Sequence, residues 1–125
     1  MTDARVPSAA DLIWNRACTD LGDRAGDRHL RALLLVHGMV VNGGPNHAAD
    51  SCEPAQLTAA ADACRYFGLP QLAALMLQLP AATFDEDAED RLSAAYHELV
   101  PDDATIVAAF EARYAQAPAD FAAPH

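Results

Sequence analysis

Polar side chains that could do chemistry gather at one short segment, His37-Gly38-Met39-Val40-Val41-Asn42-Gly43-Gly44, and just after it. His37 interrupts an apolar run, and Asn42 and His47 follow it closely. Imidazole and amide groups can fix a small molecule in a cleft or move its protons. We therefore take His37, Asn42 and His47 as a candidate cleft. The alternative is structural, with His37 hydrogen-bonded in the core and Asn42 holding a turn.

Two further chemistries can be drawn from the same region, and neither matches a standard pattern. His37, His47 and Cys52 lack the spacing of known zinc-binding motifs. Cys52 precedes an expected helix start near His47, which suggests a cysteine nucleophile, but no other part of such a site is evident. The glycine pair follows a helix rather than a strand, so no phosphate-binding loop is indicated. We predict no catalytic residue, no metal and no cofactor.

Negative charge is concentrated in the C-terminal half of this acidic chain, whose net charge is −10. Residues 69–125 hold ten acidic side chains and only two arginines. Such a surface repels nucleic-acid phosphates and attracts a basic protein, so we expect no direct nucleic-acid binding. The alternative is that the charge only keeps the protein soluble. The candidate interaction residues are Asp85, Glu86, Asp87, Glu89, Asp90, Glu98, Asp102 and Asp103.

The elements that must position these groups are helices. The chain has 125 residues and an alanine-rich, aromatic-poor apolar fraction of 52%, which favours closely packed helices. We predict an all-α single domain over residues 1–125, a bundle of about six helices with 1–7 and 118–125 as flexible tails. Phe121 is expected to dock on the body. Apolar spacing places the helices at about 8–21, 28–41, 54–67, 70–79, 86–99 and 103–116.

The second of these helices is apolar nearly all round and is expected to be central in the bundle. Residues 22–26 read as a turn, and Asp27 as the cap of a helix starting at Arg28. We expect Gly38 to let another helix approach closely. Asn42-Gly43-Gly44-Pro45 is expected to stop the helix, and a short helical turn is expected between Asn46 and Cys52.

No apolar run approaches the roughly 18 to 20 residues needed to cross a bilayer, so no membrane association is expected. The first seven residues, Met1 to Pro7, have no apolar stretch of the kind a secretory signal requires. We therefore expect a cytoplasmic location.

Four pieces of the chain together resemble a known family. They are the segment ending in Asn42-Gly43-Gly44, then Cys64-Arg65-Tyr66-Phe67-Gly68-Leu69, Tyr96-His97-Glu98-Leu99, and Tyr114 to Phe121. In this order they resemble the bacterial DNA-mimic-protein-like domain, over roughly Arg28 to Phe121. The resemblance implies an all-helical fold and the imitation of DNA toward a DNA-binding transcription factor. Pro45, Asn46 and His47 stand where many members have an aromatic residue and a glutamine.

The leading functional hypothesis is a non-enzymatic interaction protein that presents its acidic C-terminal half to a basic partner, such as a DNA-binding regulator. One alternative is a small-molecule or enzymatic cleft near His37, Asn42 and His47. Another is an immunity or antitoxin protein, because such proteins also use acidic surfaces against basic targets. The sequence leaves the oligomeric state open, with a homodimer among the alternatives.

Overall fold

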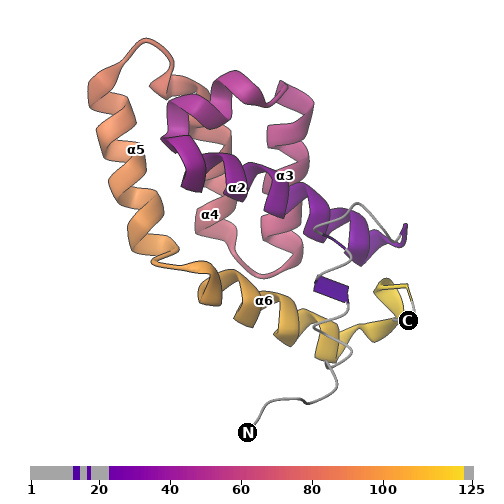
Figure 1. Cartoon of the computed structure of the whole chain (residues 1–125). Coiled ribbons are helices and arrows are strands. Elements are labelled where there is room, and N and C mark those ends of the chain that lie inside the picture. Colours follow the sequence, from indigo (N-terminus) through magenta and orange to yellow (C-terminus); the bar gives the residue numbers. More distant parts are fainter. Residues whose placement is uncertain (1–12, 15–16, 18–22, 123–125) are drawn as a thin grey trace, which may run out of the picture.

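The computed structural model describes residues 13, 14, 17 and 23–122. This part of the chain is all-α and contains no strand. The helix expected over 8–21 lies mostly outside the described residues, so the count of six helices stays a prediction. Trp14, which is described, packs against the ring of Phe110. The elements are α2 (Ala25–Ser51), α3 (Pro54–Tyr66), α4 (Pro70–Gln78), η1 (Leu79–Ala82), α5 (Glu86–Leu99), α6 (Asp103–Gln116) and η2 (Pro118–Asp120), with η denoting a 3-10 helix (Figure 1).

Helix α2 is longer than predicted and is broken inside. Gly44 has φ 84° and ψ 179°, a non-helical conformation that is open almost only to glycine. The expected stop at Asn42-Gly43-Gly44 is therefore real, but Pro45 does not prevent resumption. Proline fits the first position of a helix, where its missing N–H costs nothing, so a second helical segment runs from Pro45 to Ser51.

The start of α2 also differs from the prediction, because Ala25 and Gly26 are helical rather than part of a turn. Asp27 is not the cap of the helix but sits inside its first turn. Its buried carboxylate accepts the backbone N–H of Arg24 at 3.2 Å and that of Ala122 at 2.8 Å. The first turn of α2 is thus tied to a segment 95 residues away.

Close backbone approach occurs at Gly26, not at Gly38. A Cβ built on Gly26 would lie 2.6 Å from the Phe121 ring and 2.8 Å from the Asp120 carbonyl oxygen. A Cβ on Gly38 would meet nothing within 4 Å, so the predicted helix contact there is wrong. Phe121 is buried against the body, which confirms its predicted docking, and residues 118–120 form η2. Residues 123–125 lie outside the described part.

Helices α3 and α4 follow the predicted apolar spacing. Both begin with a proline at a first helical position, as predicted from Pro54 and Pro70. Gly68, with φ 75°, supplies the left-handed residue that separates them. Their inner faces are buried: Leu57, Ala60, Ala61, Cys64 and Phe67 in the first case, and Leu72, Leu75, Met76 and Leu79 in the second.

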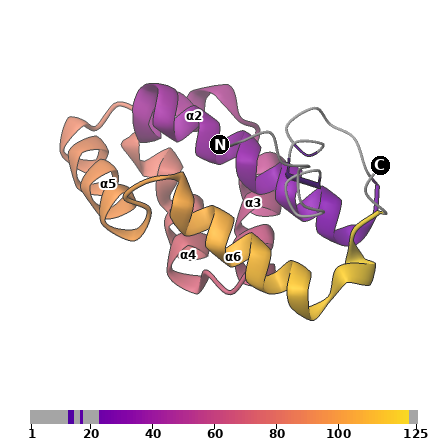
Figure 2. The same cartoon turned by 60° about the horizontal axis from the view of Figure 1, so that its bottom comes forward.

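Helices α5 and α6 are each capped by an aspartate. The Asp85 carboxylate accepts the N–H of Ala88, and the Asp102 carboxylate accepts that of Ala104. Figures 1 and 2 show α5 along one end of the molecule and α6 running back toward the start of α2. The turn between α5 and α6 therefore lies beside the middle of α2, where His37 is found.

None of the helices in the described part of the chain combines the length and hydropathy that a bilayer-spanning segment requires.

Candidate functional site

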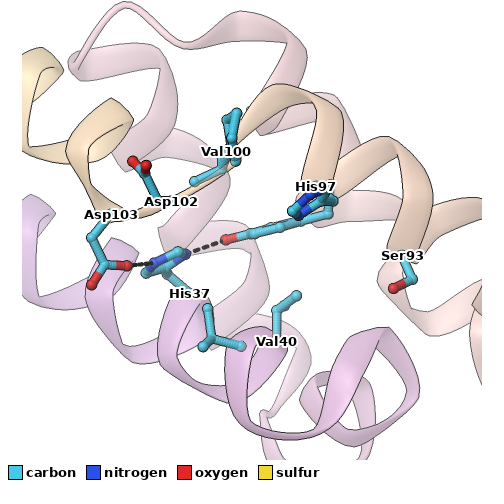
Figure 3. Close-up of a pocket in the computed structure, with 10 residues that line it drawn as sticks. His37, Val40, Ser93, His97, Val100, Asp102 and Asp103 are labelled. Carbon is cyan, nitrogen blue, oxygen red and sulfur yellow. Dashed lines mark hydrogen bonds and ion pairs between the residues drawn. The ribbon is translucent and has the colours of Figure 1, made fainter.

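His37 joins three helices through two short hydrogen bonds. Its Nδ1 lies 2.7 Å from the Tyr96 hydroxyl oxygen on α5, and its Nε2 lies 2.8 Å from Asp103 Oδ1 at the start of α6. Figure 3 shows the imidazole beside Asp103, with a dashed line on each side of the ring for the two hydrogen bonds. His37 and Tyr96 are buried, whereas the Asp103 side chain is 75% exposed. The histidine is therefore hydrogen-bonded in the core, as the structural alternative holds, and also reaches the surface through Asp103.

The charge of Asp103 determines which atoms donate and which accept in the hydrogen bonds that link Asp103, His37 and Tyr96. An ionised carboxylate only accepts hydrogen bonds, so His37 Nε2 carries the proton that points to Asp103. In the neutral imidazole Nδ1 is then the acceptor, and the Tyr96 hydroxyl donates to it. Burial raises the pKa of Tyr96 well above its ordinary value, which keeps the phenol protonated for this donation.

A pocket of about 400 Å³ opens beside these residues, where α2, α5 and the start of α6 meet. Its inner part holds His37, Tyr96 and the apolar side chains Val40 and Val100, all buried. The exposed mouth is formed by Val41, Ser93, His97, Pro101, Asp102 and Asp103. The volume is near the lower end of the range for small-molecule sites in proteins.

The other two residues of the predicted cleft do not join this pocket. Asn42 and His47 are exposed and lie outside its lining. The His47 ring instead stands over Gly43, where an added Cβ would meet it at 2.5 Å, and its Nδ1 faces the Ser51 hydroxyl at 3.5 Å. Of His37, Asn42 and His47, only His37 lines a cavity of useful size.

The cysteine and metal alternatives gain no geometric support. Cys52 is buried, and burial raises the pKa of its thiol, which is the opposite of what a nucleophile needs. His47 contacts Ser51 rather than Cys52. Within the described ranges, no group of three or more histidine, cysteine, aspartate or glutamate side chains could hold a metal ion.

Four of the eight predicted interaction carboxylates make contacts inside the protein. Asp85 and Asp102 cap helices, and Asp103 binds His37. Glu89 Oε1 accepts the backbone N–H of Asn46 at 2.7 Å, so it caps the helical segment that restarts after Gly44. These four carboxylates have a local or tertiary structural role.

The other four, Glu86, Asp87, Asp90 and Glu98, are exposed on α5. Helical spacing places them opposite the buried residues Ala88, Leu92 and Tyr96. We call these four carboxylates the α5 acidic face. Within α5 only Arg91 adds a permanent positive charge.

An exposed aromatic residue, not among the predicted site residues, lies just before α5. Phe84 is fully exposed and has φ 64°, a left-handed conformation that is uncommon for a bulky side chain. It lines a hollow of about 380 Å³ together with Asn46, Ala82, Asp85, Glu86 and Glu89. The one available signal was an aromatic residue inside an acidic linker. Tyr96 falls within the helix predicted over 86–99, and no local pattern marks it as a partner of His37.

Comparison of the chain with protein-family models, curated proteins and solved structures finds no match. The resemblance to the DNA-mimic-protein-like domain therefore stays a prediction.

Proposed function

We propose that this chain is a non-enzymatic interaction module that presents the α5 acidic face and Phe84 to a basic protein. The observation that supports this most is the position of Phe84, a fully exposed aromatic ring next to Asp85, Glu86 and Glu89. Aromatic side chains dominate the binding energy of many interfaces, and surrounding charges steer and select the partner. The Phe84 ring packs on nothing where it stands, because it is fully exposed.

The conformation of Phe84 strengthens this reading. A left-handed backbone costs a non-glycine residue about 1–2 kcal/mol, and the exposed ring regains nothing by packing. Strain of this kind tends to persist where a side chain has a use outside the folded core. A glycine at this position would remove the strain but also the aromatic group.

The partner we propose is a DNA-binding protein in the cytoplasm. A row of carboxylates along a helix can occupy a groove that reads phosphate charge and its spacing. Glu86, Asp87 and Asp90 lie in the first two turns of α5 and Glu98 lies in its last turn, all exposed. The family resemblance of the sequence points to the same class of partner.

The proposal is tested by affinity capture from a lysate of the source organism, followed by mass spectrometry. One variant carries Glu86→Gln, Asp87→Asn and Asp90→Asn. Its matched control carries Asp23→Asn, Asp50→Asn and Glu111→Gln, exposed residues outside the α5 acidic face. Both variants change the net charge equally. We expect a partner that the wild type and the control retain, the first variant loses, and high salt releases.

Competition with duplex DNA examines the class of partner. A captured protein that duplex DNA displaces from the wild-type chain supports imitation of DNA. A specific partner that is indifferent to duplex DNA would keep the interaction module and overturn the DNA-binding assignment. Equal loss of the partner in both triple variants, or no specific partner, would overturn the module itself.

A further inference from the structure

The pocket between α2, α5 and α6 has a one-sided charge. Its lining contains the carboxylates of Asp102 and Asp103 and neither lysine nor arginine. It also lies in a protein whose net charge is −10. A cation is therefore attracted to this pocket both by the two nearby carboxylates and by the field of the whole molecule.

The hydrogen-bonding groups at the inner part of the pocket can act toward a ligand only as acceptors. The Tyr96 hydroxyl donates its only hydrogen to His37 Nδ1, and the N–H of His37 donates to Asp103. The Tyr96 oxygen and the second Asp103 oxygen then have lone pairs and no proton to offer. A ligand that meets both has to donate hydrogen bonds.

Apart from Ser93 and His97 at the mouth, the rest of the pocket lining is apolar. Val40 and Val41 on α2, and Val100 and Pro101 at and after the end of α5, contribute hydrocarbon surface. Figure 3 shows Val40 and Val100. A bare metal ion would leave this surface without a partner. No cluster of three or more metal-ligating side chains occurs in the part of the chain that the structure describes.

We propose that this pocket binds a small organic ammonium ion, a primary amine on an apolar chain. The ammonium group donates to Asp103 and to the Tyr96 oxygen, and the hydrocarbon chain packs on the valines. Asp102 adds a second negative charge at the mouth. The site is independent of the proposed partner surface, because it uses Asp102 and Asp103 rather than the α5 acidic face.

The probes are three six-carbon compounds that differ in their head group: n-hexylammonium, 1-hexanol and hexanoate. Each is titrated into the ¹⁵N-labelled protein at neutral pH and fixed ionic strength, and amide shifts are followed by NMR. We expect hexylammonium to shift residues 37–41 and 93–103, with a Kd at least tenfold lower than that of the other two compounds. Equal binding of hexanol, or no binding of hexylammonium, would overturn the proposal.

Asp103→Asn distinguishes the pocket from the general field of the protein. The asparagine keeps an oxygen that accepts from His37 but loses the charge. Asp23→Asn removes the same charge from an exposed position outside the pocket. We expect at least a tenfold loss of hexylammonium affinity for Asp103→Asn and less than a twofold loss for Asp23→Asn. Equal losses in the two variants would mean that only the overall charge attracts the amine.

Asp102→Asn gives a second test if Asp103→Asn does not fold, as judged by circular dichroism. Asparagine caps a helix as well as aspartate does, so α6 keeps its start. A threefold or larger loss of hexylammonium affinity is expected. An unchanged Kd in this variant would count against a carboxylate-lined amine site.

Discussion

The imidazole Nδ1 of His37 lies 2.7 Å from the hydroxyl oxygen of Tyr96, which is 59 residues further along the chain. Both side chains are buried. If one of them is removed, the other keeps a buried polar atom with one partner fewer. The pair is therefore a long-range link between α2 and α5 whose energy can be measured.

Tyr96→Phe and His37→Leu are each expected to lower the free energy of unfolding by about 1–3 kcal/mol, because each leaves a buried group unpaired. The double variant is expected to lose less than the sum, by about 1 kcal/mol. Urea unfolding of all four proteins gives this coupling energy. Additive losses would show that the contact contributes nothing of its own.

Two glycines of α2 are expected to respond to alanine in opposite directions. Gly44→Ala should destabilise the protein by about 1–3 kcal/mol, because its φ of 84° disfavours a side chain and the new Cβ would meet Glu89 Oε2 at 2.6 Å. Gly38→Ala should stabilise it by about 0.5–1 kcal/mol, because the position is helical and nothing lies within 4 Å. Thermal unfolding decides both, and a shift of the same sign in the two variants would contradict the assignment.

Phe84→Gly is expected to raise stability while it weakens partner binding. Relief of the left-handed strain gives about 1–2 kcal/mol, and the greater freedom of glycine in the unfolded chain takes back about 0.4–1 kcal/mol. The net gain should appear as a higher midpoint of urea unfolding. Phe84→Ala, which keeps the strain and loses the ring, is the matched control, and a destabilised glycine variant would show that the ring packs on the body.

Acidification should destabilise the protein partly through His29. Burial lowers the pKa of this histidine, whose ring stacks on Tyr66. As the pH falls below about 6.5, the histidine value in the unfolded chain, the unfolded state takes up a proton more readily than the folded state. The contribution of His29 to the free energy of unfolding is therefore fully present above that pH and is lost as the pH falls below it. The His29→Phe variant should lose less stability than the wild type between neutral pH and pH about 5; parallel curves would contradict this.

The buried thiols should be slow to react in the folded protein. Burial raises the pKa of Cys64 to about 12 and also raises that of Cys52. At mildly alkaline pH both remain protonated and shielded, and the thiolate is the reactive form. Iodoacetamide labelling with peptide mapping should modify Cys64 at least 100-fold more slowly in buffer than in urea, an order-of-magnitude expectation. Rapid labelling of Cys52 in buffer would revive its role as a nucleophile.

Local sequence signals predicted most of the helices. In α3 to α6 the apolar spacing, the leading prolines and the capping aspartates all act within a few residues, so they can be read directly from the sequence. The Gly44-Pro45 pair shows where this fails. A glycine followed by a proline is typical both of the end of one helix and of the start of another. Here Gly44 ends the first helical segment of α2 and Pro45 begins the second.

The candidate site depended on contacts that no local pattern carries. Glu86 and Glu89 look alike in the sequence, yet Glu89 is bound to Asn46, 43 residues away, while Glu86 is exposed. In the same way, His37 was identified as a candidate, but its partners Tyr96 and Asp103 lie 59 and 66 residues further on. Asn42 and His47 are near His37 in the sequence and outside its pocket in space.

The bond between the Asp27 carboxylate and the Ala122 N–H affects how the protein is made. A ribosome adds roughly 5–20 residues per second, so the partner of Asp27 is synthesised roughly 5–20 seconds after Asp27 itself. During that time the first turn of α2 lacks both this hydrogen bond and the cover of Phe121. The first turn of α2 therefore gains this hydrogen bond and the cover of Phe121 only when residues 121 and 122 have left the ribosome.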